Sequence, residues 1–384
     1  MALSEFCSVA PEVVRPGHLF PRRARNEGRR LGSAAVVAFI TRLARALTIR
    51  MSVLSPKDSA ELIAKNARDV TIDPNGISKV SNVVLDCYNR GLVGTHAWRD
   101  HPLHPKVADD TAAQWVFLVD ALNFNFWADN SAEYFAVRWN GALHSGYYSL
   151  CAVVARALEE GVPILSADFC RSISLQQVQH IFRSDTSTDI PLLEERHRVL
   201  QEWGHVLSSM YDGSFANCIR ECNKWCQVLL RMVVKNFTSF QDEGTFEGLK
   251  VSFYKRAQIL VADLWSCFNG QGLGEFKDIG TLTAFADYRV PQVLAYFGAL
   301  RYSPRLTALL AKGNLFQNGS KEEMEIRGAT IHACELVRKE LKKRKLPSAE
   351  INSVLVDYCL WDYRRRHENE VEHVPFHRVR CIYY

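Results

Sequence analysis

The sequence has no long apolar run, and outside its first fifty residues it has no large excess of charge. The longest nearly apolar run covers residues 34–40, which is far too short to span a bilayer. Residues 1–50 hold nine Arg, no Lys and three Glu, which leaves 38 basic and 39 acidic residues in the rest. A chain that is nearly neutral after residue 50 is poorly suited to binding a long phosphate backbone by charge. We therefore expect no membrane and no nucleic-acid partner, and favour a small-molecule substrate.

Paired cysteines are also missing. The 11 Cys are scattered and odd in number, which is typical of reduced, buried thiols in an intracellular protein. Cys218, Cys222 and Cys226 recur every four residues within a helix that we predict over 215–235. Zinc and iron–sulfur sites favour tight Cys-x-x-Cys pairs. We read these thiols as a packed helix face and expect neither a metal nor a cofactor.

Residues 1–50 differ from the rest because they are rich in Arg and poor in acids. Two interpretations stay open: a mitochondrial transit peptide, or a non-functional upstream segment with translation starting at Met51. Residues 51–384 are predicted to form a single domain. We expect the protein in the cytoplasm, or in mitochondria if the extension acts as a transit peptide.

From Met51 onward the pattern predicts a mainly α-helical domain. Ser55 and Pro56 supply a cap and a first helical residue. Near residues 134–148 the pattern changes: apolar residues alternate on both sides of Asn140-Gly141, a strong type I′ turn signal, so we expect one small β-hairpin there. Further helices are expected at 174–183, 191–210, 215–235, 251–268, 291–300, 304–312, 328–343 and 348–366.

Asp287 is the most informative acid of the sequence. Pro291 is well placed to open a helix, so Asp287 should lie just ahead of a helix N-terminus, with Arg289 two residues on. The helix dipole and the guanidinium both favour the carboxylate anion, which suits a developing cationic sugar. A purely structural N-terminal cap is the alternative.

Other polar residues have competing interpretations. His101 lies in the segment DHPLHP at 100–105, whose two prolines predict a loop, where an exposed histidine is the simpler interpretation. Lys255 and Arg256 could contact a phosphate or extend along the surface. Asp357 and Asp362 are about 140° apart around a helix, which argues against both pointing into one narrow pocket.

From about residue 54 to the C-terminus, several long stretches of the sequence, in the same order, resemble the queuosine salvage family, the queuosine 5′-phosphate N-glycosylase/hydrolases. The strings are WVF at 115–117, LNFNFW at 122–127, SGYYSL at 145–150, RSDT at 183–186, EERHR at 194–198, VSFYKRAQILVAD at 251–263, FADYRVPQVL at 285–294, DYCLWDY at 357–363 and PFHRVRCIYY at 375–384.

The resemblance implies a fold similar to helical DNA glycosylases and hydrolysis of queuosine 5′-monophosphate to queuine and ribose 5-phosphate. It places the catalytic aspartate on Asp287 and the substrate contacts on His101, Phe285, Asp357 and Asp362. Lys255, Arg256 and Arg289 are further candidates for binding the 5′-phosphate. The alternatives are a nucleic-acid base glycosylase of similar fold and a non-catalytic helical binding protein. The sequence leaves open whether Asp287 attacks covalently, and it leaves open the oligomeric state.

Overall fold

A computed structural model describes residues 52–129, 133–344 and 351–384, which belong to one unit, Ile49–Tyr384. The Arg-rich extension, and with it the transit-peptide prediction, lies outside these ranges. Within them, no helix has the length and apolar character that a membrane crossing needs.

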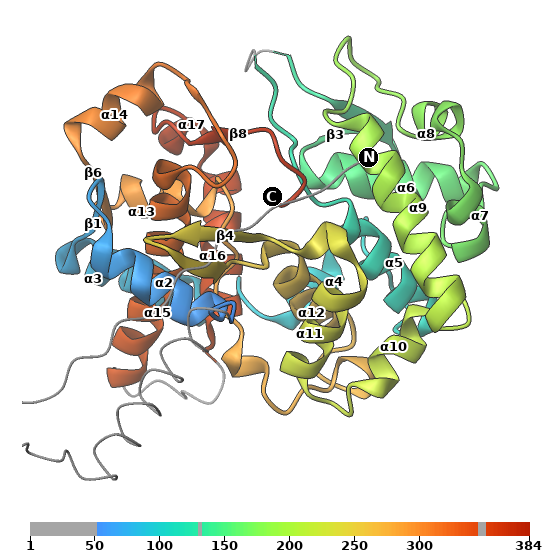
Figure 1. Cartoon of the computed structure of the whole chain (residues 1–384), viewed down its shortest axis with the longest axis horizontal. Helices are drawn as coiled ribbons and strands as arrows, with labels where there is room; N and C mark the ends of the chain where they lie inside the picture. Colours follow the sequence, from blue (N-terminus) through green and yellow to red (C-terminus); the bar gives the residue numbers. More distant parts are fainter. Residues whose placement is uncertain (1–51, 130–132, 345–350) are drawn as a thin grey trace, which may run out of the picture. The chain divides into compact units, whose positions relative to one another are not determined.

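The described residues are mainly helical, as predicted (Figure 1). The α-helices are α2 (Pro56–Asn66), α3 (Pro74–Asn89), α4 (Thr95–Asp100), α5 (Asp110–Ala121), α6 (Tyr147–Glu159), α7 (Ala167–Ser172), α8 (Leu175–Ile181), α9 (Leu193–Met210), α10 (Phe215–Glu221), α11 (Cys226–Asn236), α12 (Lys255–Cys267), α13 (Val290–Tyr296), α14 (Pro304–Ala311), α15 (Lys321–Lys343), α16 (Ser353–Arg366) and α17 (Glu368–Val371). The strands are β1 (Val70–Ile72), β2 (Ala136–Trp139), β3 (Ala142–Ser145), β4 (Glu243–Phe246), β5 (Leu249–Ser252), β6 (Leu300–Tyr302), β7 (Leu315–Phe316) and β8 (Arg378–Val379).

The predicted hairpin is confirmed as β2–β3, and its turn has φ of 47° at Asn140 and 77° at Gly141. The prediction of only one small sheet is wrong, because β1–β6, β4–β5 and β7–β8 also pair. Strands β1 and β6 come from distant parts of the chain and have three residues each, so local alternation gives no signal for them. Strand β5 takes residues that we assigned to the helix over 251–268, which begins only at Lys255.

Two helical predictions need further comment. The start of α2 is confirmed, since the Ser55 side chain accepts a hydrogen bond from the Asp58 backbone N–H at 3.2 Å. The prediction of a single helix over residues 215–235 is wrong. Asn223 and Lys224 have φ of 51° and 66°, a left-handed conformation that interrupts the helix between α10 and α11. The ten described cysteines, Cys218, Cys222 and Cys226 among them, are buried and free.

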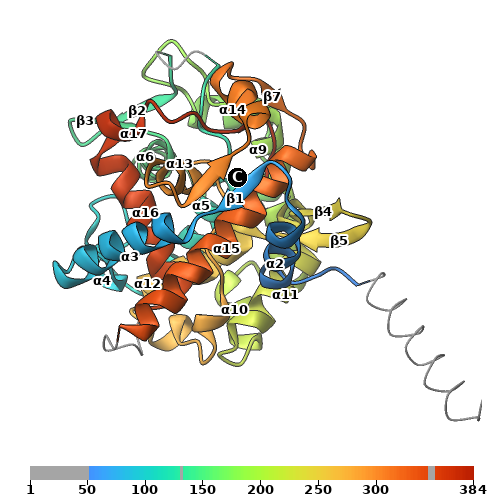
Figure 2. The same cartoon turned by 90° about the vertical axis from the view of Figure 1, so that its left-hand side faces the viewer.

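Apolar side chains gather in two large clusters, and helices that line the site come from both. The first includes residues of α5, α6, α9, α11 and α12, and the second includes residues of α3, α13, α15 and α16. Figure 1 shows these two groups of helices side by side, and Figure 2 shows α15 running diagonally next to α3 and α16, against which it packs.

The C-terminal segment is anchored by a buried polar network. Arg327 of α15 donates to both carboxylate oxygens of Asp242 at 2.8 and 2.6 Å, and its guanidinium lies 4.2 Å from the ring centroid of Tyr384. The Tyr384 hydroxyl donates to Glu323 at 2.8 Å. This network holds the last residues of the chain against the helical body, where they line a cavity.

Candidate active site

Two cavities adjoin in the structure. The aromatic cavity has a volume of about 270 Å³ and the arginine cavity about 710 Å³. Five residues line both: Asn123, Tyr147, Lys255, Asp287 and Trp361. The boundary between the two cavities therefore carries one buried acid and one buried base.

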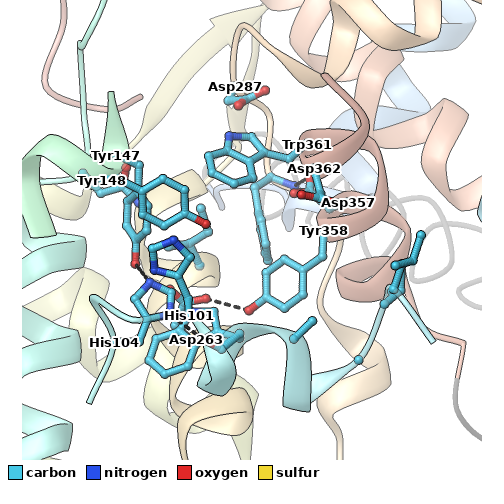
Figure 3. A pocket seen from close by; sticks show the side chains of 18 of the residues that line it. His101, His104, Tyr147, Tyr148, Asp263, Asp287, Asp357, Tyr358, Trp361 and Asp362 are labelled. Carbon is cyan, nitrogen blue, oxygen red and sulfur yellow. Dashed lines mark hydrogen bonds between the residues drawn. The ribbon is translucent and has the colours of Figure 1, made fainter. Parts of the chain in front are cut away.

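The aromatic cavity combines rings with acids. Its lining includes Trp98, His101, His104, Tyr147, Tyr148, Asp263, Phe285, Asp287, Asp357, Tyr358, Trp361 and Asp362. Figure 3 shows Asp287 at one end of these side chains, and Asp263 and His101 at the other. Such walls suit a flat ligand that carries hydrogen-bond donors or a positive charge.

Asp287 lies just before α13, as predicted. Its Oδ1 accepts hydrogen bonds from the backbone N–H groups of Arg289 at 2.9 Å and of Val290 at 2.8 Å. The residue is therefore both a cap and a cavity-lining acid, and the two interpretations are compatible. Burial raises the pKa of Asp287, whereas the Lys255 cation and the two backbone N–H groups lower it. The helix N-terminus and the Arg289 charge favour the anion, as expected, but desolvation outweighs these contacts and the pKa is raised overall.

Lys255 begins α12 and is buried at the boundary of the two cavities. Its Nζ donates to the Asn123 carbonyl at 3.2 Å. Burial lowers the pKa of Lys255, while the charges of Asp287, Asp120 and Asp357 raise it. A buried cation close to Asp287 is the strongest counter-charge that this acid has.

Arg256 is not brought to the site. It is buried, lines neither cavity, and donates to the backbone carbonyls of Ala121 and Ser239. The alternative interpretation, that Lys255 and Arg256 extend along the surface, is wrong for both residues. Arg289 does line the arginine cavity, with its guanidinium 5.0 Å from the ring centroid of Phe376.

Asp357 and Asp362 both line the aromatic cavity. The argument that their separation of about 140° around the helix keeps them from sharing a pocket is therefore wrong. Asp357 is buried and accepts from the Phe285 backbone N–H at 2.8 Å. The Asp362 side chain is 42% exposed and accepts from Arg366 Nε at 2.6 Å. The cavity is wide enough for α16 to present one acid at depth and the other near the solvent.

We expect Asp357→Asn to stabilise the protein at about pH 8. Burial, and then the charge of Asp287, holds the pKa of Asp357 well above its usual range. A carboxyl group with a raised folded-state pKa costs stability as pH rises from the unfolded pKa, about 3.9, through the folded one, because the unfolded chain ionises first. The neutral variant avoids that cost, so its Tm should be higher by about 2 °C or more at high pH, and the gain should vanish near the unfolded pKa.

Asp86→Asn is the matched control, because the side chain of Asp86 on α3 is 63% exposed. Thermal unfolding of the three proteins across pH tests the prediction. An equal Tm for wild type and Asp357→Asn at high pH would contradict it.

His101 follows α4 and is half-buried, so the interpretation of an exposed loop histidine is wrong. Its ring stacks on Tyr148, with centroids 3.8 Å apart and planes at 9°. Burial, and then the charge of Arg365, lowers the pKa of His101 to about 4. The ring is therefore neutral near pH 7 and contributes a flat stacking surface rather than a charge.

Sequence reasoning missed Asp263. It lies on α12, lines the aromatic cavity, and accepts from the Tyr358 hydroxyl at 2.6 Å (Figure 3). Burial raises the pKa of Asp263 to about 6. A signal was present, because Lys255, Ile259 and Asp263 are spaced four residues apart and so share one helical face. The aromatic residues Tyr147, Tyr148, Tyr358 and Trp361 were also missed as lining residues.

The chain is similar to proteins of one family over most of its length. The family model described as queuosine salvage protein matches residues 103–384. A protein from Mus musculus named queuosine 5′-phosphate N-glycosylase/hydrolase is 49% identical over 336 residues, which are 86% of this chain and 99% of that protein. Proteins of the same name from Bos taurus and Sphaerobacter thermophilus are 47% and 37% identical, covering 86% and 87% of this chain and 99% and 98% of their own lengths.

Proposed function

The chain belongs to the queuosine salvage family, and from this premise we propose that it hydrolyses the N-glycosidic bond of queuosine 5′-monophosphate at Asp287. The products are queuine and ribose 5-phosphate. The observation that carries the assignment is the position of Asp287, which lines both cavities. A ribose bound at this boundary would have its base in the aromatic cavity and its 5′-phosphate in the arginine cavity.

The chemistry needs a negative charge beneath the sugar. Cleavage of the bond builds an oxocarbenium-like ribose, and a fixed carboxylate stabilises that charge where it develops. Backbone N–H bonds to Oδ1 fix Asp287, and Lys255 favours its ionised form. The carboxylate is required whether it acts electrostatically or as a nucleophile.

The leaving group is a 7-deazapurine, which has carbon at the position of the purine N7 and so cannot be protonated there. The departing base must be held by other hydrogen bonds. We assign this role to Asp357 and Asp362, one of which also suits the cationic amine of the queuine side chain. Phe285 and the stacked His101 supply surfaces for the flat ring.

Release of free queuine and ribose 5-phosphate from the nucleotide, followed by liquid chromatography and mass spectrometry, tests the activity. Arg289→Gln is expected to lower kcat/KM for the nucleotide by about tenfold or more, since a charged hydrogen bond to phosphate contributes about 1.5–3 kcal/mol. Turnover of the nucleoside should change little.

The exposed Arg90 provides the control, and Arg90→Gln should leave both substrates unaffected. An equal loss on nucleoside and nucleotide would remove Arg289 from the phosphate site. Absence of free base with either substrate would reject the proposed reaction.

We also propose that residues 51–384 suffice for this activity and act in the cytoplasm. A chain beginning at Met51 is expected to match the kcat/KM of the full chain within about twofold, because the described residues that line the two cavities all lie between Leu92 and Tyr384. Mass spectrometry of the natural N-terminus would separate a start at Met51 from cleavage of a transit peptide.

A further inference from the structure

The arginine cavity is larger than a 5′-phosphate requires. Its volume of about 710 Å³ exceeds the 270 Å³ of the aromatic cavity, which receives the base in the proposed function. Cavities of about 300–1,000 Å³ enclose ligands of drug size. A nucleotide bound with its phosphate near Lys255 and Arg289 therefore leaves room on the far side of that phosphate for a second group.

The lining of this cavity includes five basic side chains, those of Lys255, Arg289, Arg364, Arg365 and Arg378. Arg364 is already paired with Glu368 and Glu372. Among residues 52–129, 133–344 and 351–384, no carboxylate lies within ion-pair distance of Arg289 or Arg365. The Arg289 and Arg365 guanidiniums can therefore contact a phosphate of the ligand, whether it is a monoester or a diester.

Aromatic rings lie next to Arg289, whose guanidinium is 5.0 Å from the ring centroid of Phe376. The Phe376 ring lies 6.2 Å from that of Trp127 and 5.3 Å from that of Tyr288, measured between centroids. Arg378 lies over Phe376 and Trp127, at 5.5 and 5.8 Å from their centroids. Rings combined with guanidinium planes form the kind of surface on which unpaired nucleobases stack.

We propose that this chain also cleaves queuosine held as the 3′-terminal residue of a dinucleotide, with the upstream nucleoside bound against Phe376 and Trp127. The inference rests on the proposed function. Water supplies its oxygen to C1′ of the terminal ribose, the bond from C1′ to the base breaks, and the base takes up a proton. The phosphodiester stays intact. The products are queuine and a nucleoside joined through its 3′-phosphate to O5′ of ribose.

The test compares queuosine 5′-monophosphate with uridylyl-(3′→5′)-queuosine on the same enzyme preparation. We expect the two kcat/KM values to agree within about tenfold, since stacking of the added base offsets the loss of one phosphate charge. Mass spectrometry must detect the intact diester product, because a route that first hydrolyses the diester to the monophosphate would not yield it.

Phe376→Leu identifies the cavity involved. It should lower kcat/KM for the dinucleotide at least about fivefold more than for the monophosphate, because any loss of support for Arg289 affects both substrates, whereas the stacking surface is used only by the upstream base. Phe297→Leu removes an aromatic ring that lines neither cavity, and should leave the ratio of the two substrates unchanged.

Turnover of the monophosphate without turnover of the dinucleotide would overturn this inference and leave the proposed function standing. Turnover of neither would overturn both. If both are cleaved and Phe376→Leu leaves their ratio unchanged, the assignment of the upstream nucleoside to the arginine cavity is wrong.

Discussion

Asp287→Asn is expected to lower kcat for queuosine 5′-monophosphate by at least about a thousandfold, because it removes the charge that stabilises the ribose cation. The amide oxygen of Asn can still accept from the N–H groups of Arg289 and Val290, which now bond to Oδ1. The start of α13 should therefore remain intact. Single-turnover measurements with both proteins, together with thermal unfolding and queuine binding, separate lost chemistry from lost structure.

Asp109→Asn is a matched control. Asp109 also caps a helix, since its Oδ1 accepts from the Ala112 backbone N–H at 2.9 Å, but it lines neither cavity. This variant should retain full turnover. Turnover by Asp287→Asn within about tenfold of wild type would show that no essential negative charge resides there.

Lys255→Met is the second variant for which we expect a large effect, a fall in kcat/KM of about a hundredfold at neutral pH. Burial raises the pKa of Asp287, and the Lys255 cation is the largest contribution that lowers it. Without the cation, that pKa rises further and less of the enzyme carries the ionised acid. The acidic limb of the profile of kcat/KM against pH should therefore move to higher pH, with partial recovery of activity in alkaline buffer.

The control for this variant is Lys250→Met, since Lys250 on β5 is exposed and lines neither cavity. Its profile should coincide with that of wild type. A Lys255→Met enzyme that loses activity equally at every pH would contradict the electrostatic role and leave Lys255 as a substrate contact only.

Local features were predictable wherever neighbouring residues decide them. The cap at Ser55, the turn at Asn140 and the position of Asp287 before a helix depend on the backbone preferences of a few adjacent residues. The break between α10 and α11 was missed because left-handed residues other than glycine have a weak sequence signal. Strand pairs between distant segments, such as β1 and β6, had no recognisable sequence signal.

The sequence by itself determined which residue types are present and which local element carries each of them, and its long matching strings indicated the family. Only the tertiary structure decided which of these side chains meet. Adjacent residues on a helix point about 100° apart, so Lys255 enters both cavities while Arg256 is directed to backbone carbonyls. The packing of α12, α13 and α16 gathers Asp263, Asp287 and Asp357 around one space, and the burial that this packing creates sets their pKa values.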